Sequence, residues 1–290
     1  MYHFKSESKV MDDAARASAP GKFIQLQNGI THYELSDTDS AQTVVLIHGY
    51  STPYFIWDMN FASLVSAGFR VLRYDLFGRG YSDHLDVSYN AHLFDRQLLE
   101  LLDGLRIERP ISVVGLSMGA PIAARFAARR PQQVQKLVCI DPVGIPWKRS
   151  LKARILEMPL IGEMTLDNND DRLADDLRSD FFNPERIPDR YIERYMEQLQ
   201  YIGFKNSLLS SLRNKMFTGA ADAFAVIGKT NLPVLLLWGR NDTLIPFENS
   251  AQFQKLIPQI ELRTFDECGH IPNIEYADEV NALLIKWLSL

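Results

Sequence analysis

The chain has 290 residues, of which 46% are hydrophobic and 23% charged, a balance that is ordinary for a globular protein. Its formal net charge of −5 offers no basic surface for nucleic acid or anionic lipid. No apolar run approaches the roughly 18 residues that a membrane span needs. We therefore expect a small-molecule partner, with no nucleic acid and no transmembrane segment.

The first twenty residues mix charged and small side chains and contain no hydrophobic stretch of the kind found in a signal peptide. We interpret residues 1–20 as a loose N-terminal arm. The chain has two cysteines, Cys139 and Cys268, which are too few for a disulfide framework. Both are predicted to be free thiols, and this favours a reducing, cytoplasmic compartment.

Strand and helix patterns alternate along the chain. A hairpin is predicted first, because Asn28-Gly29 is a strong turn signal between two short strands. The later strands are near-continuous apolar runs, which are typical of parallel strands covered on both faces. They span residues 44–47, 70–74, 111–114, 134–140, 234–237 and 260–265, and most are separated by helical stretches. The pattern predicts a doubly wound, mostly parallel α/β sheet of about eight strands.

The segment Gly115-Leu116-Ser117-Met118-Gly119 lies between a predicted strand and a predicted helix. A sharp turn from strand to helix strains the residue at the turn, and flanking glycines avoid a collision between side chains. The hydroxyl of Ser117 would then be exposed at a helix N-terminus, where free N–H groups favour negative charge. We interpret the segment as a nucleophile elbow.

Three other predicted strands end in residues that carry chemistry. The first is followed by His48-Gly49-Tyr50, the second by Asp242 and the third by His270. A serine, an acid and a histidine in this order, each after the carboxyl end of a strand, resemble the α/β-hydrolase family. The resemblance extends from Lys22 to Leu290. It implies an eight-stranded α/β-hydrolase fold and a serine hydrolase similar to carboxylesterases and monoacylglycerol lipases.

Residues 143–230 contain no strand-like run, although a crossover between parallel strands needs only about a dozen residues. Relatives in the α/β-hydrolase family carry a helical cap at this place. The resemblance therefore implies a cap over residues 143–230, between two parts of the hydrolase core at 21–142 and 231–290. Six aspartates between Asp167 and Asp180 are interpreted as a solvated helix face rather than a metal site.

The resemblance assigns a catalytic triad to Ser117, His270 and Asp242. Ser117 is a poor nucleophile until a base removes its proton, and His270 would be that base. Asp242 would orient the imidazole and stabilise the imidazolium that forms. Asp141, after the sixth strand, is an alternative acid, because some hydrolases place their acid there. Asp242 is favoured because it follows the seventh strand, which is the usual position in the family.

An oxyanion hole needs two converging backbone donors. The resemblance implies that these are the N–H groups of Met118 and Tyr50, and that His48 braces the loop before Tyr50. The glycine-rich segment 75–83 is interpreted as a turn, because it falls short of the dinucleotide-binding fingerprint. No cofactor and no metal site are predicted.

A serine at the elbow argues against dehalogenases and epoxide hydrolases, whose elbow carries a carboxylate. We predict hydrolysis of a carboxylic ester with an apolar acyl or aryl group, through an acyl-enzyme. One alternative is hydrolysis of carbon–carbon bonds in ring-cleavage products, by relatives that commonly have a tryptophan where this chain has Ile271. Cofactor-free peroxidase-like esterases keep the same triad, and some members of the fold only bind ligands.

The predicted cap is rich in methionine and phenylalanine, which suit an acyl chain or an aromatic ester. We expect some of these side chains to wall the substrate pocket. They are Met158, Met164, Met196, Met216, Phe181, Phe182 and Phe204.

Overall fold

One eight-stranded sheet runs through the molecule. The computed structural model describes residues 1–38, 40, 42–107, 110–148, 151–167 and 169–290. The strands are β1 (Lys22–Gln25), β2 (Ile30–Leu35), β3 (Thr43–Ile47), β4 (Arg70–Tyr74), β5 (Ile111–Leu116), β6 (Val134–Ile140), β7 (Val234–Gly239) and β8 (Glu261–Phe265). Their order in the sheet is β1-β2-β4-β3-β5-β6-β7-β8. The pairs β1–β2 and β2–β4 are antiparallel and the others parallel, which confirms the predicted doubly wound sheet.

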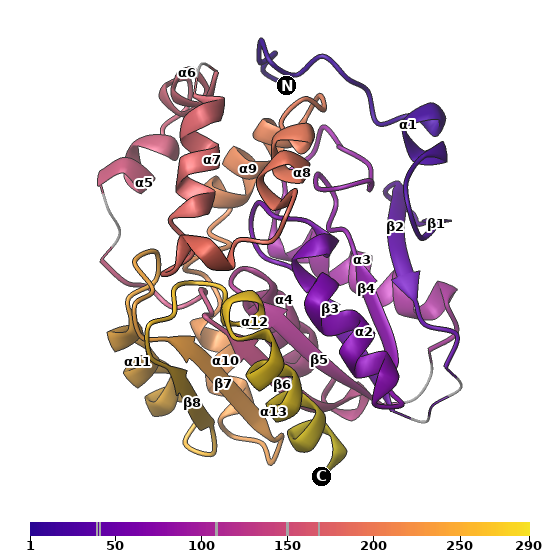
Figure 1. The fold of residues 1–290 in the computed structure, drawn as a ribbon, viewed down its shortest axis with the longest axis vertical. Helices are drawn as coiled ribbons and strands as arrows, with labels where there is room; N and C mark the ends of the chain where they lie inside the picture. The colour runs from indigo at the N-terminus through magenta and orange to yellow at the C-terminus, as the bar shows by residue number, and fades with distance from the viewer. Residues whose placement is uncertain (39, 41, 108–109, 149–150, 168) are drawn as a thin grey trace.

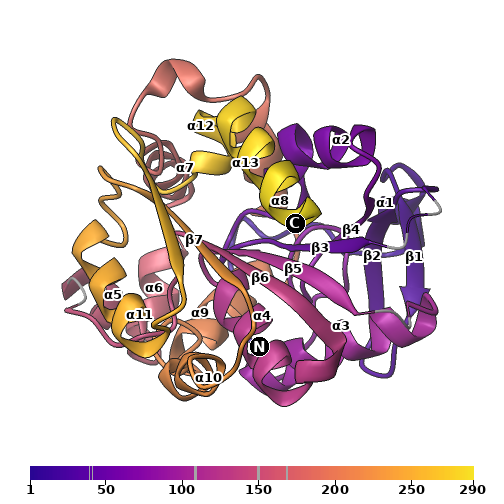
Figure 2. The same ribbon diagram turned by 90° about the horizontal axis from the view of Figure 1, so that it is seen from below.

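Helices surround this sheet. They are α1 (Asp13–Ala17), α2 (Asp58–Ser66), α3 (Ala91–Gly104), α4 (Gly119–Arg129), α5 (Leu151–Leu156), α6 (Ile161–Leu166), α7 (Asp170–Arg178), α8 (Tyr191–Gln198), α9 (Phe204–Arg213), α10 (Ala221–Ile227), α11 (Ser250–Leu256), α12 (Pro272–Glu275) and α13 (Ala277–Ser289). Figure 2 shows α2, α12 and α13 on one face and α3, α4, α10 and α11 on the other. Within the described residues, no helix is long and apolar enough to cross a membrane.

The central strands are buried on both sides, as their unbroken apolar runs predict. In β3, Val45 and Ile47 belong to one hydrophobic cluster, whereas Val44 and Leu46 belong to another. Successive side chains of a strand point to opposite faces, so each face of the sheet has its own core. These two cores fix the strands whose ends carry the candidate catalytic residues.

The long connection after β6 forms a helical layer at one end of the sheet. Figure 1 shows α5 to α9 grouped there, above the ends of the strands. The last helix of the connection, α10, is different, because it packs against α4 and α11 in the core layer. The predicted cap, residues 143–230, includes α10, although the contacts of this helix are with the core layer.

The N-terminal segment is docked on this helical layer. The N–H of Lys9 donates to the carbonyl of Gln200 at 2.8 Å, and the N–H of Ile202 donates to the carbonyl of Lys9 at 2.8 Å. The buried carboxylate of Glu7 accepts backbone N–H groups at the start of α9, including that of Lys205 at 2.7 Å. The expectation of a loose arm is therefore wrong for this part of the chain, because backbone pairing holds it in place.

Candidate active site

Ser117 lies at the turn between β5 and α4. Its backbone has a φ of +51°, and its N–H donates to the carbonyl of Ile140 in β6 at 2.8 Å. A Cβ on Gly115 would lie 2.5 Å from the carbonyl carbon of Gly119, and one on Gly119 would lie 2.2 Å from the carbonyl oxygen of Ile47. Only glycine fits at both positions, so helix α4 can start directly against the sheet. The local geometry is that of a nucleophile elbow.

His270 and Asp242 form a buried hydrogen-bonded pair. Nδ1 of His270 lies 2.7 Å from Oδ2 of Asp242, whose other oxygen accepts the N–H groups of Leu244 and Ile245, each at 2.8 Å. Since a carboxylate only accepts, the proton of the neutral ring lies on Nδ1 and Nε2 has a free lone pair. Burial opposes the charged ring, but the Asp242 carboxylate outweighs it and raises the pKa of His270 above its usual value.

Asp141, the alternative acid, lies beside this pair. One carboxyl oxygen of Asp141, one of Asp242 and a ring nitrogen of His270 all lie within 4.8 Å of one another. The hydrogen bond to the imidazole nevertheless comes from Asp242, while Oδ1 of Asp141 accepts the N–H of Gly239 at 3.0 Å. The geometry of the pair therefore favours Asp242 as the orienting acid.

The loop after β3 lies against the elbow. A Cβ on Gly49 would lie 3.4 Å from Cβ of Ser117. Neither the N–H of Tyr50 nor that of Met118 donates to another of the described residues, so both are available to an oxyanion. His48 lies behind the loop, where Nδ1 donates to the carbonyl of Gly49 at 3.0 Å and Nε2 accepts the N–H of Leu76 at 2.9 Å. Burial lowers the pKa of His48 to about 4, so it is neutral and holds the loop.

Arg79 is a second support of this loop that no sequence motif predicted. Its side chain is fully buried, and it donates to the carbonyl of Tyr50 at 2.9 Å and to Oγ of Ser211 in α9 at 2.9 Å. Burial lowers the pKa of Arg79 to about 10, so the side chain is still cationic at neutral pH. It therefore joins the loop after β3, which is the predicted oxyanion loop, to the cap. In the sequence it stands in the glycine-rich segment 75–83, where it gave no signal beyond a turn.

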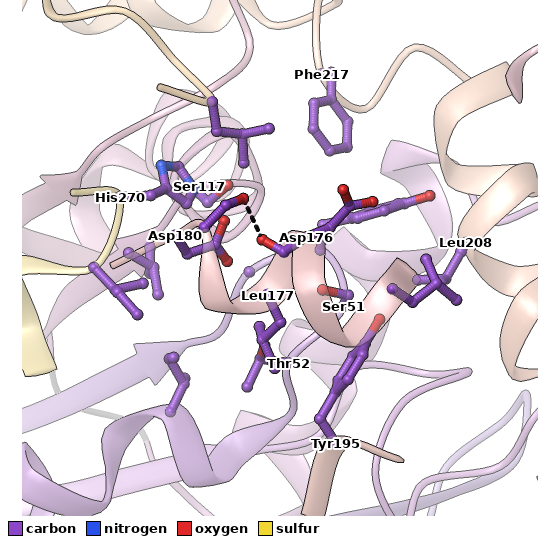
Figure 3. A pocket seen from close by; sticks show the side chains of 18 of the residues that line it. Ser51, Thr52, Ser117, Asp176, Leu177, Asp180, Tyr195, Leu208, Phe217 and His270 are labelled. Carbon is purple, nitrogen blue, oxygen red and sulfur yellow. Dashed lines mark hydrogen bonds between the residues drawn. The ribbon is translucent and has the colours of Figure 1, made fainter. Parts of the chain in front are cut away.

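A cavity of about 260 Å³ separates the elbow from the cap. Ser117 and His270 reach it from the core, and Figure 3 shows them close to Asp180 of the cap. Most of the remaining lining is apolar. The leucine, isoleucine, tyrosine and phenylalanine side chains that line it are Tyr50, Ile56, Leu116, Leu156, Leu166, Leu173, Leu177, Tyr191, Tyr195, Leu208, Leu212, Phe217, Leu244 and Ile271.

The cap residues expected to wall the pocket do not line it. Met158, Met164 and Phe182 are largely exposed, whereas Met216 and Phe204 are buried in the packing of the protein. The remaining two, Met196 and Phe181, pack in the hydrophobic core next to the second face of the sheet. Leucines and Phe217 take their place, so the expectation of an apolar pocket holds but its residues were wrong.

The aspartates between 167 and 180 were predicted to form a solvated helix face, but only some of them are exposed. Asp171 and Asp175 are exposed, as predicted, but Asp176 and Asp180 line the cavity. Asp167 is buried and accepts the N–H of Lys5 at 2.8 Å. Burial raises the pKa of Asp180 to about 7, although the nearby His270 opposes the shift. The wall opposite the elbow therefore carries a carboxyl group that titrates near neutral pH.

The segment that carries Asp180 is fastened to the histidine loop. The N–H of His270 donates to the carbonyl of Asp180 at 2.7 Å. The carboxylate of Glu275, in α12, accepts the N–H of Gly269 at 2.6 Å and those of Phe182 and Asn183 at 3.0 and 2.9 Å. These four bonds fix the backbone around Asp180 relative to the backbone of His270.

Comparisons with known proteins agree with this architecture. The family model of the alpha/beta hydrolase fold matches residues 42–277, so the chain belongs to the α/β-hydrolase family and is a hydrolase. It is 28% identical to the 2-hydroxy-6-oxononadienedioate/2-hydroxy-6-oxononatrienedioate hydrolase 1 of Dechloromonas aromatica, over 94% of this chain and 96% of that protein. It is 25% identical to the 2-hydroxy-6-oxo-6-phenylhexa-2,4-dienoate hydrolase of Burkholderia cepacia, over 94% and 97%.

Solved structures show the same fold at lower identity. A meta-cleavage product hydrolase of Pseudomonas fluorescens superposes with a TM-score of 0.77 at 24% identity, covering 93% of this chain and 97% of that one. An esterase of Exiguobacterium antarcticum superposes with a TM-score of 0.80 at 20% identity, covering 93% and 100%. At such identities the likeness concerns the fold alone.

Proposed function

We propose that the protein is a serine hydrolase that cleaves a carboxylic ester with an apolar acyl or aryl group. The observation that carries this proposal is the composition of the cavity, in which Ser117 and His270 face a wall of leucine and aromatic side chains. Among the described residues that line it, none is a lysine or an arginine. An uncharged, apolar substrate suits such a cavity best.

The proposed mechanism assigns one role to each residue of the site. Nε2 of His270 takes the proton of Ser117, whose oxygen attacks the carbonyl carbon of the ester. The N–H groups of Tyr50 and Met118 stabilise the negative charge on the carbonyl oxygen. Asp242 holds the ring and stabilises the imidazolium, which then gives its proton to the leaving alcohol. Water attacks the acyl-enzyme by the same route and releases the acid and Ser117.

A second candidate is the hydrolysis of a carbon–carbon bond in a ring-cleavage product. Its support is the names of the relatives, which favour it over ester hydrolysis; the esterase shares only the fold. The substrates in those names are dienoates or dioates, which carry negative charge. The carboxyl group of Asp180 on the cavity wall would disfavour such a substrate, and the described lining residues include no lysine or arginine that would attract it. Ile271 also stands where such relatives commonly have tryptophan.

One assay separates the two candidates. We would measure kcat/KM of the purified protein for p-nitrophenyl butyrate and for 2-hydroxy-6-oxo-6-phenylhexa-2,4-dienoate in the same buffer. Ester hydrolysis as the main activity predicts that the ester is preferred by at least about tenfold, which is about 1.4 kcal/mol of transition-state stabilisation. A preference for the dienoate would establish the second candidate instead.

The Ser117→Ala variant is the control for both substrates. It should lower turnover of the preferred substrate by several orders of magnitude, leaving roughly 10³–10⁴ over the uncatalysed rate from binding and the oxyanion hole. Labelling of wild type but not of this variant by a fluorophosphonate would place the nucleophile. A folded wild type that turns over neither substrate and takes no label would point to a ligand-binding member of the fold.

A further inference from the structure

Asp141 has a fully buried carboxyl group. Asp141 follows β6 with a φ of +40°, and its side chain is 0% exposed. Oδ1 accepts the N–H of Gly239 at 3.0 Å, whereas Oδ2 has no hydrogen-bond partner among the described residues. A buried polar atom without a partner is costly, so Oδ2 requires an explanation.

The groups around Asp141 make a negative charge there unfavourable. The titratable side chains that act on it are Asp242 after β7 and Glu275 of α12, both acidic, and Cys268 and His270 lie in the loop after β8. Arg186 acts on Cys268 and Glu275, but no lysine or arginine is among the described groups that shift the pKa of Asp141. The oxygens of Asp242 already accept three N–H groups. Two adjacent buried carboxylates cannot both ionise without a large cost.

We propose that Asp141 is held as a neutral carboxylic acid whose O–H donates to a carboxylate oxygen of Asp242. This proton gives Oδ2 of Asp141 the partner that it otherwise lacks. It also converts a repulsive pair of carboxylates into a charge-assisted hydrogen bond. Asp141 is then a positioning residue that acts on His270 through Asp242, and its effect on turnover rests on the proposed hydrolase function.

The electrostatics of the pair agree with this assignment. Burial raises the pKa of Asp141 well above its usual value, and the neighbouring Asp242 raises it further. The Gly239 N–H opposes the shift without cancelling it. A neutral Asp141 adds no negative charge near His270, so it does not join Asp242 and Asp180 in raising the pKa of the imidazole.

The first test compares the stability of wild type and Asp141→Asn as a function of pH, independently of any activity. Asn tolerates a positive φ and keeps an N–H donor toward Asp242. In the wild type the raised pKa means that, above the ordinary value of about 4, the folded protein holds one proton more than the unfolded chain. The free energy of unfolding of the wild type, relative to that of the variant, must therefore fall as the pH rises, until the pH passes the raised pKa of Asp141.

The measurement is denaturant unfolding of both proteins between about pH 5 and pH 8. The ratio of the wild-type to the variant unfolding constant should rise by up to about tenfold per pH unit. A ratio that stays constant over this range would show that Asp141 is already ionised and would overturn the proposal. Asp141→Gly also lacks the titrating group and accepts the positive φ, so it replaces Asp141→Asn if that variant does not fold.

The second test uses the pH profile of kcat/KM. Asp141→Asn should keep kcat within about threefold, because the amide is neutral like the proposed carboxylic acid and keeps a donor toward Asp242. The fall of kcat/KM at low pH, the acid limb of the profile, reports the protonation of His270, and it should stay at the same pH. Asp141→Gly removes the donor, and we expect kcat to fall about tenfold to a hundredfold. An acid limb that moves down by about one unit or more in Asp141→Asn would reveal a lost negative charge, contrary to the proposal. A loss near 10⁴ in that variant would make Asp141 the orienting acid, and would also overturn it.

Discussion

The two walls of the cavity are held in different ways. The core wall consists of short backbone segments at the ends of strands, such as the elbow at Ser117, where close-packed glycines leave no freedom. The cap wall is made of side chains that project from helices, for example Leu173 and Leu208. The segment around Asp180 is fastened to the core wall by the bond from the His270 N–H to the carbonyl of Asp180 and by the carboxylate of Glu275.

This difference implies a division of labour. In the proposed mechanism, groups on the core wall meet the reacting atoms. Changes there should therefore act on kcat, because they alter interactions made only in the transition state. Side chains on the cap wall offer area and charge to the rest of the substrate, so changes there should act on KM and on selectivity. The predictions below test that division.

On the core wall, Asp242→Asn should lower kcat by up to about 10⁴, because an amide no longer fixes the proton of His270 on Nδ1. It should also move the acid limb of kcat/KM to lower pH. In the wild type Asp242 raises the pKa of His270, so the neutral imidazole is protonated as the pH falls through that raised value. Without the Asp242 carboxylate, the imidazole of His270 stays neutral down to a lower pH. Steady-state kinetics between about pH 5 and pH 9 measure both effects. A variant with a normal rate would remove Asp242 from the mechanism.

At the joint between the walls, Arg79→Met should lower kcat by about tenfold to a hundredfold with little change in KM. The variant leaves the carbonyl of Tyr50 without its charged donor, so the oxyanion loop loses its alignment. The matched control is Arg213→Met, because Arg213 is paired with Glu163 within the cap. Equal losses of kcat in both variants would mean that cap stability, and not the loop, is what Arg79 supports.

The same contrast explains what the sequence could and could not predict. The strands and the elbow follow from local patterns, since glycine spacing and apolar runs report on backbone packed in a predictable way. Asp141 and Asp242 stood out for the same reason, as both follow strands. Their shared proton depends on a contact between residues a hundred positions apart in the chain, which no local pattern records.

The cap wall lacked such a signal. Its methionines and leucines are equally apolar, and only the orientation of each helix decides whether Leu173 or Met164 faces the cavity. Asp180 looked like its exposed neighbours on α7, because the turn that directs it inward is set by Glu275, far along the chain. Arg79 likewise acts through the carbonyl of Tyr50 and not through a motif.

On the cap wall, Asp180→Asn should remove a pH-dependent discrimination against anionic esters. In the wild type the Asp180 carboxyl, with a pKa of about 7, gains its negative charge as the pH rises through neutrality. The ratio of kcat/KM for a neutral ester to that for an acyl-chain carboxylate of equal length should therefore rise about tenfold from pH 6 to pH 8. The ratio cancels the titration of His270, which both esters share.

In Asp180→Asn this ratio should be nearly independent of pH, and turnover of the dienoate should improve. Asp171→Asn is the control, because Asp171 is exposed on α7, the helix that precedes Asp180, and does not line the cavity. If both variants keep the wild-type pH dependence, another group sets the charge preference of the cavity.

The smallest expected effect concerns the apolar part of the cap wall. Each buried CH₂ of an acyl chain offers about 0.8 kcal/mol at most, so kcat/KM should rise by up to about fourfold per carbon until the cavity is full. Leu173→Ala enlarges the cavity, and the chain length at which the rise stops should become longer while kcat for acetate stays the same. The matched control is Leu151→Ala, because Leu151 is a cap leucine that is 71% exposed. A series of p-nitrophenyl esters of increasing acyl length measures both variants. If the two length profiles coincide, or if acetate is preferred throughout, the leucines of the cap only pack against the core and do not select the acyl chain.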